Sequence, residues 1–168
     1  MAIESRLTPA VLAAVSALSA PAEAADNQQV YSRENMPVFA GPEDYFTGDV
    51  KVEMAFPDDN TPYSGAFVTF QAGAHTAWHT HPAGQHMVVL RGKAITATRT
   101  GQVVIFAEGD TVWCPQDIDH WHGATSEGPM THFVITGSKN GEAVTWKDKV
   151  TPAQYQAAVN VLFKEGKL

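Results

Sequence analysis

Hydrophobic and polar residues alternate in short runs along most of the chain after residue 49. In the run SGAFVTFQ at residues 64–71, Ala66, Val68 and Phe70 fall on one face of an extended strand. Further strand-like runs follow at residues 50–55, 86–90, 93–99, 102–106, 110–114 and 131–136. Glycine and proline separate these runs at short intervals. Many short strands divided by turns predict an all-β fold, either a barrel or a sandwich.

The two ends of the chain depart from this β pattern. Residues 25–48 contain several prolines and glycines and predict an irregular N-terminal arm before the β domain at residues 49–150. Thr151, Pro152 and Gln154 form a capping-box pattern, and apolar residues recur after them at helical spacing. We therefore expect a C-terminal helix over residues 151–168, packed on the β domain or on a neighbouring subunit.

The first residues have the features of a secretory signal peptide. Arg6 precedes the apolar run LTPAVLAAVSALSA, which is too short to span a bilayer. The run is followed by Ala22-Glu23-Ala24, a small-x-small cleavage pattern. A signal peptide at residues 1–24 predicts an exported protein, periplasmic or secreted, with no membrane attachment after cleavage. The alternative is an amphipathic or buried N-terminal helix, which Pro9 disfavours.

Charge and cysteine content narrow the possible partners. The chain has 11 basic and 18 acidic residues, and no basic cluster interrupts the sequence. Binding to nucleic acid or to an anionic membrane surface is therefore not expected. A small-molecule substrate and further copies of the chain, in a dimer or tetramer, are the expected partners. The single cysteine, Cys114, excludes an intrachain disulfide and is interpreted as a buried apolar thiol.

Histidines occur in pairs two residues apart at two places in the chain. His79 and His81 form one pair, and His120 and His122 form the other. Residues two apart on a strand point to one face, and a third run supplies His132. If that face lines a barrel interior, these imidazoles converge and can bind a divalent transition metal. The alternative is that they are surface residues or isolated, hydrogen-bonded core residues.

Two segments of the chain resemble the two sequence motifs of the cupin superfamily. They read Gly73-x5-His79-x-His81-x3-Gln85-x6-Gly92 and Gly109-x5-Pro115-x-Asp117-x2-His120. The family pattern usually has glutamate at the position of Gln85 and glycine at that of Asp117. The resemblance implies a double-stranded β-helix (jelly-roll) barrel that holds a divalent metal. Carried over by position, the metal ligands are His79, His81, Gln85 and His120.

A narrower resemblance concerns the small bacterial cupin hydroxynitrile lyases. The segments TAWHTHPAGQ, HWHGA and MTHFVI are similar to that group, and the similarity extends over roughly residues 40–157. It implies a metal held by three histidines and one glutamine, usually manganese. Iron, nickel, cobalt and zinc also suit three nitrogens and one oxygen. Glutamine adds no charge, so the metal keeps its full +2 and favours Lewis-acid chemistry over oxygen activation.

Three further residues are candidates for catalysis. His132 and His122 can act as acid or base near neutral pH, and a nearby cationic metal keeps them unprotonated. We expect His132 to be the base, partly because of the family resemblance; His122 is the alternative base or a residue that orients a ligand. Thr76 can donate a hydrogen bond, although it can equally serve a turn. His75 and His86 are assigned no role.

The resemblance implies cleavage of cyanohydrins to an aldehyde or ketone and hydrogen cyanide, and the reverse addition. One alternative is another metal-dependent cupin enzyme, such as a dioxygenase, decarboxylase or isomerase. Another is a cupin that binds a small molecule without catalysis. These alternatives share the same barrel and the same histidine cluster, so the sequence alone does not separate them.

Overall fold

The computed structural model describes residues 28–167, so the predicted signal peptide at residues 1–24 lies outside the described residues. A compact unit begins at Tyr31. Among the described residues, no helix is long and apolar enough to cross a membrane. A short 3₁₀ helix, η1 (Arg33–Asn35), precedes the first strand.

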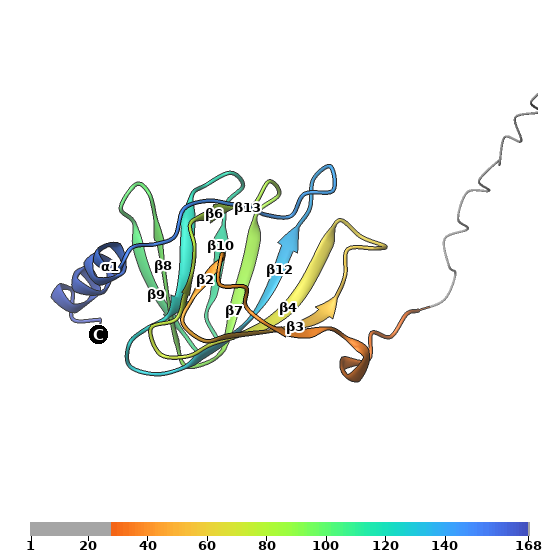
Figure 1. Cartoon of the computed structure of the whole chain (residues 1–168), viewed down its shortest axis with the longest axis horizontal. Helices are drawn as coiled ribbons and strands as arrows, with labels where there is room; N and C mark the ends of the chain where they lie inside the picture. Colours follow the sequence, from red (N-terminus) through yellow and green to blue (C-terminus); the bar gives the residue numbers. More distant parts are fainter. Residues whose placement is uncertain (1–27, 168) are drawn as a thin grey trace, which may run out of the picture. The chain divides into compact units, whose positions relative to one another are not determined.

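Two antiparallel β-sheets build the unit that begins at Tyr31 (Figure 1). The first sheet has the strand order β1-β3-β4-β12-β7-β10. Its strands are β1 (Val38–Ala40), β3 (Val50–Phe56), β4 (Tyr63–Phe70), β7 (Gln85–Arg91), β10 (Thr111–Cys114) and β12 (Met130–Gly137). The second sheet contains β2 (Phe46–Thr47), β5 (His75–Thr76), β6 (His79–Thr80), β8 (Lys93–Thr98), β9 (Val103–Ala107), β11 (His120–Ala124) and β13 (Thr145–Trp146). This architecture confirms the predicted all-β jelly-roll barrel.

The main hydrophobic core fills the space between the two sheets. Phe70, Met87 and Met130 of the first sheet are fully buried there. Ala94, Phe106 and Ala124 contribute from the second sheet. The inward-facing positions of β4 are Ala66, Val68 and Phe70, as its alternating sequence predicts.

The predicted C-terminal helix is present as α1 (Pro152–Lys164), which lies beside β8 and β9 (Figure 1). The Thr151 side chain accepts a hydrogen bond from the backbone N–H of Gln154, and the Gln154 side chain accepts one from the backbone N–H of Thr151. Ala158 and Leu162 are buried in a second apolar cluster, against Trp121 and neighbouring residues of the second sheet. The helix ends at Lys164, four residues before the predicted boundary.

The predicted irregular arm at residues 25–48 contributes two short strands to the sheets. Within it, β1 pairs with β3, and β2 pairs with β5. Phe46 of β2 packs on the main core. Runs of two or three residues are too short to show an alternating pattern, so tertiary pairing with existing strands, not local sequence, defines them.

Candidate functional site

Three of the histidines predicted as metal ligands meet inside the barrel. His79 on β6 and His120 on β11 are direct cross-strand partners, and their ring centroids are 4.3 Å apart. His81, just after β6, places its ring 4.9 Å from that of His79 and 5.4 Å from that of His120. All three side chains are buried. Antiparallel pairing of β6 with β11 therefore brings together residues about forty positions apart in the chain.

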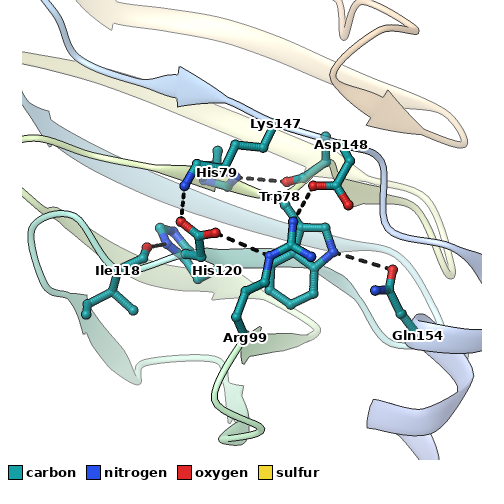
Figure 2. Close-up of polar contacts among 10 residues, drawn as sticks. Trp78, His79, Arg99, Ile118, His120, Lys147, Asp148 and Gln154 are labelled. Carbon is teal, nitrogen blue, oxygen red and sulfur yellow. Dashed lines mark hydrogen bonds and ion pairs between the residues drawn. The ribbon is translucent and has the colours of Figure 1, made fainter.

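Each of these histidines is oriented by a backbone carbonyl. The carbonyl partners of the Nδ1 atoms are Ala77 for His79 at 2.9 Å, Ala143 for His81 at 2.7 Å and Ile118 for His120 at 2.9 Å. Figure 2 shows the contact between His120 and Ile118. A carbonyl oxygen accepts but cannot donate, so Nδ1 carries the proton and Nε2 keeps its lone pair. This arrangement is typical of histidines that bind a metal.

The unpartnered polar atoms at this centre match a divalent cation. His81 Nε2, His120 Nε2 and Gln85 Oε1 are buried and have no hydrogen-bond partner among the described residues. Buried polar atoms without partners are costly, and an ion that accepts their lone pairs removes that cost. Gln85, at the start of β7, donates through its amide nitrogen to Thr136 Oγ1 at 2.8 Å and so keeps its oxygen available. With His79, which offers a ligand atom within 4.8 Å of one from His120, the residues present fit a metal with three nitrogen ligands and one oxygen ligand.

Burial keeps these imidazoles neutral. It lowers the pKa of His81 to about 4, and it lowers the pKa values of His79 and His120 as well. The neighbouring histidines lower the pKa of His79 further, because a second positive charge close by is unfavourable. A neutral imidazole is the form that binds a metal, so the centre is ready to do so at neutral pH.

A second ligand set shares two of these residues. The ligand atoms of His79, His120 and His122 all lie within 4.8 Å of one another. His122 differs from His81 in one respect, because its Nδ1 atom is buried without a hydrogen-bond partner among the described residues. Since metal-binding histidines usually donate their second nitrogen to a fixed acceptor, the carbonyl contacts favour His81 over His122 as a ligand.

The three candidate catalytic residues lie next to the metal centre. The ring of His122 is 5.1 Å from that of His132, and both pack edge-on against Phe70. His132 is fully buried, and neither of its ring nitrogens has a hydrogen-bond partner among the described residues. Burial lowers the pKa of His132 to about 3, so it is a free base at neutral pH. Thr76 Oγ1 accepts a hydrogen bond from the His122 backbone N–H at 3.1 Å and lies 3.5 Å from the protonated Nδ1 of His79, so its own proton is left to donate.

A cavity of about 190 Å³ opens onto these residues. Val68 and Phe70 of β4 and Val134 and Thr136 of β12 line it. Ala66 and Met87 are buried in the core and are not among the described lining residues of the cavity. The described lining residues include no lysine, arginine, aspartate or glutamate. The cavity is therefore suited to an uncharged ligand with an apolar group.

Sequence reasoning missed the segment that covers one side of this cavity. Ala143, Val144 and Trp146 line it, although they follow the last long strand by several residues. The Trp146 ring lies 4.8 Å from that of His79 and stacks on Tyr45 at 4.7 Å. No periodic pattern surrounds Trp146. The similarity to the hydroxynitrile lyase group over roughly residues 40–157 includes Trp146 and was the available signal.

Charged residues next to the metal centre hold this segment in place (Figure 2). Asp119, which precedes His120, forms ion pairs with Arg99 and Lys147. Arg99 also pairs with Asp148 and lies over the ring of Trp78 at 4.3 Å. These contacts fix the two residues that follow Trp146 against the strands that carry His79 and His120.

The described lining residues of the cavity do not include His75, His86 or Cys114, although Cys114 is the cross-strand partner of Gln85. His75 stacks on Tyr155 of α1 at 4.8 Å, and its Nδ1 contacts the Gly73 carbonyl. His86 is exposed and lies 4.4 Å from the Trp113 ring. Burial raises the pKa of Cys114 to about 12, so it remains a thiol and is not a nucleophile.

Comparison with known proteins agrees with this architecture. The cupin domain family matches residues 66–136. A protein of Granulicella tundricola named (R)-mandelonitrile lyase is 43% identical over 117 residues, covering 69% of this chain and 89% of the relative. The crystal structure of a cupin-like protein from Thermotoga maritima is 33% identical, covers 78% of this chain and 97% of its own, and superposes with a TM-score of 0.68.

A more distant structure shares the fold alone. A cupin-2 domain protein from Rhodospirillum rubrum is 15% identical and covers 84% of this chain and 95% of its own, with a TM-score of 0.58. The fold and the site together define the class of protein: a jelly-roll barrel with a buried histidine cluster that can hold a metal ion. The chain belongs to the cupin superfamily, and its sequence resembles that of a mandelonitrile lyase.

Proposed function

We propose that this protein is a metal-dependent lyase that cleaves cyanohydrins to an aldehyde or ketone and hydrogen cyanide, and that catalyses the reverse addition. The observation that carries the proposal is a fully buried His132, without a hydrogen-bond partner among the residues that the structure describes, beside a neutral His/Gln centre in a cavity whose described lining has no charged side chain. The identity to the Granulicella tundricola relative over most of that protein's length supports the same reaction.

The proposed reaction divides into steps that the chain's own residues can perform. A divalent transition metal, when bound, supplies Lewis-acid polarisation of a substrate hydroxyl or nitrile. His132 accepts the hydroxyl proton on a ring nitrogen, and the electron pair of the O–H bond becomes the carbonyl π bond. The carbon–carbon bond breaks with its electron pair on cyanide. Protonated His132 then returns the proton to cyanide and releases hydrogen cyanide.

The other residues of the cavity place the substrate for this transfer. The Thr76 hydroxyl keeps a free proton and can donate to the substrate oxygen or nitrogen. Phe70, Val68 and Val134 offer an apolar wall to the substituent of the cyanohydrin. The described lining residues include no cationic side chain, so a carboxylate in the cavity would have only the metal ion to balance its charge.

Release of benzaldehyde from mandelonitrile tests the proposal. We expect protein loaded with Mn²⁺ to release benzaldehyde and cyanide in equal amounts without consuming oxygen. Treatment with a chelator serves as the control and is expected to abolish turnover. Oxygen uptake with Fe²⁺ and no cleavage of mandelonitrile would instead identify a dioxygenase, and ligand binding without any turnover would identify a non-catalytic cupin.

Three properties predicted from the sequence form part of the proposal. We propose manganese as the physiological metal, because the hydroxynitrile lyase group that the sequence resembles usually binds it with three histidines and one glutamine. Export through the signal peptide at residues 1–24 and assembly into a dimer or tetramer remain predictions. None of the three is needed for the chemistry proposed for His132.

A further inference from the structure

The amide nitrogen of Gln85 donates a side-chain hydrogen bond whose acceptor is placed by the sheet register. Gln85 on β7 and Thr136 on β12 are direct cross-strand neighbours. Both side chains are buried, and both line the cavity. The Gln85 amide nitrogen donates to Thr136 Oγ1 at 2.8 Å. The pairing of β12 with β7 therefore places a hydroxyl acceptor beside the amide nitrogen.

An amide ligand differs from a carboxylate in a way that makes this contact important. The two oxygens of a carboxylate are equivalent, so either one can bind a cation. The oxygen and the nitrogen of an amide are not equivalent, because rotation by half a turn replaces the oxygen with an NH₂ group that cannot bind a cation. A glutamine ligand therefore needs a neighbour that holds its nitrogen away from the metal. In this structure Thr136 contacts the nitrogen of the Gln85 amide, and the amide oxygen has no hydrogen-bond partner among the described residues.

We infer that Thr136 is a positioning residue for the metal centre: by accepting a hydrogen bond from the Gln85 amide nitrogen, it turns the amide oxygen towards His79, His81 and His120. The inference rests on the proposed metal centre. Partners of this kind, one step removed from the metal, change metal affinity by about 10- to 100-fold when removed. Thr136 is such a partner because its hydroxyl contacts Gln85, one of the proposed ligands.

Substitution of Thr136 by valine tests the inference. Valine keeps the branched shape and the strand preference of threonine but offers no acceptor. The Gln85 amide nitrogen is then left buried without a partner, or it rotates towards the imidazole nitrogens. We expect the dissociation constant for Mn²⁺, measured by calorimetric titration of the metal-free protein, to rise about 10- to 100-fold. Thr136→Ser, which retains the hydroxyl, is expected to bind Mn²⁺ like the unchanged protein.

Two comparisons separate positioning from a general structural effect. Thr131 lies on the same strand, and its hydroxyl contacts that of Thr69 at 3.0 Å, away from the cavity. Thr131→Val is therefore a matched control that should leave Mn²⁺ affinity unchanged. In a Gln85→Ala background, Thr136→Val should cause no further loss of affinity, because no amide remains to be oriented.

The possible results distinguish a failure of the role inferred for Thr136 from a failure of the proposed metal centre. Unchanged Mn²⁺ affinity in Thr136→Val would overturn the role of Thr136 but not the proposed metal centre. The same conclusion would follow if Thr136→Val reduced Mn²⁺ affinity as much in the Gln85→Ala background as in the unchanged protein. An unchanged protein that binds no Mn²⁺ would overturn the metal centre and the inference together. Weaker binding in Thr136→Val, rescued by serine and absent without Gln85, supports the inference.

Discussion

Replacement of His132 by glutamine should lower the rate of mandelonitrile cleavage by roughly 10²- to 10⁴-fold, the range expected when a general base is removed. Glutamine is polar and similar in size, but it cannot take up a proton near neutral pH. His132 is fully buried, and burial lowers its pKa to about 3, so in the unchanged protein it is a free base throughout the neutral range. Cleavage of mandelonitrile by the variant and the unchanged protein, both loaded with Mn²⁺, measures the effect.

His122→Gln is the matched variant for this experiment. The ligand atoms of His122, His79 and His120 lie within 4.8 Å of one another, and His132 is not part of that group. The carbonyl contacts favour His81 over His122 as the third histidine ligand, so we expect both variants to retain Mn²⁺, with the larger loss of turnover in His132→Gln. A His132→Gln protein that keeps full turnover would contradict the assignment of the base, and loss of turnover in His122→Gln alone would transfer that role to His122.

The metal-free protein should become much less stable as the pH falls below about 6.5. Burial lowers the pKa of His132 from 6.5 to about 3 in the folded protein, whereas the unfolded chain keeps the ordinary value. Between these two values the unfolded state binds more protons, so acid favours unfolding, and the stability present above pH 6.5 is lost as the pH falls towards 3. One pKa unit corresponds to about 1.4 kcal/mol, so His132 alone lowers the free energy of unfolding by roughly 2 kcal/mol between pH 6.5 and pH 5.

Urea unfolding of the metal-free protein at a series of pH values measures this dependence. His132→Gln removes the titrating group, so the loss of stability between pH 6.5 and pH 5 should be smaller in the variant. Equal losses in the two proteins would show that His132 does not carry the depressed pKa. Excess Mn²⁺ should raise stability at pH 7 and lose this effect in acid, because protons compete for the ligand nitrogens.

Sequence patterns anticipated that the candidate ligands lie close together, but they did not anticipate the residues that surround them. His79, His81 and His120 could be placed together because residues two apart share a strand face and because the cupin motif fixes their spacing. Gln85 followed from the same motif. The structure brings all four close to one another, and it brings His132 and Thr76 beside them.

Local sequence patterns could not predict contacts between segments that lie far apart in the chain. The carbonyl that orients His81 belongs to Ala143, 62 residues further on, in a segment without periodicity. The contact of Thr136 with Gln85 depends on the register of β12 against β7, which the alternation of either strand leaves undetermined. The strands of the N-terminal arm were missed for a related reason, because β1 and β2 form by pairing with longer strands.

Titration of the metal-free protein with Mn²⁺, with mandelonitrile cleavage measured at each addition, tests the central claim most directly. We predict that turnover rises in proportion to bound Mn²⁺ and stops rising at one ion per chain. His79→Ala, which removes a ligand common to both possible ligand sets, should show neither tight binding nor turnover. Cleavage that is independent of added metal, full activity in His79→Ala, or one bound Mn²⁺ per chain without cleavage would contradict a metal-dependent cyanohydrin lyase.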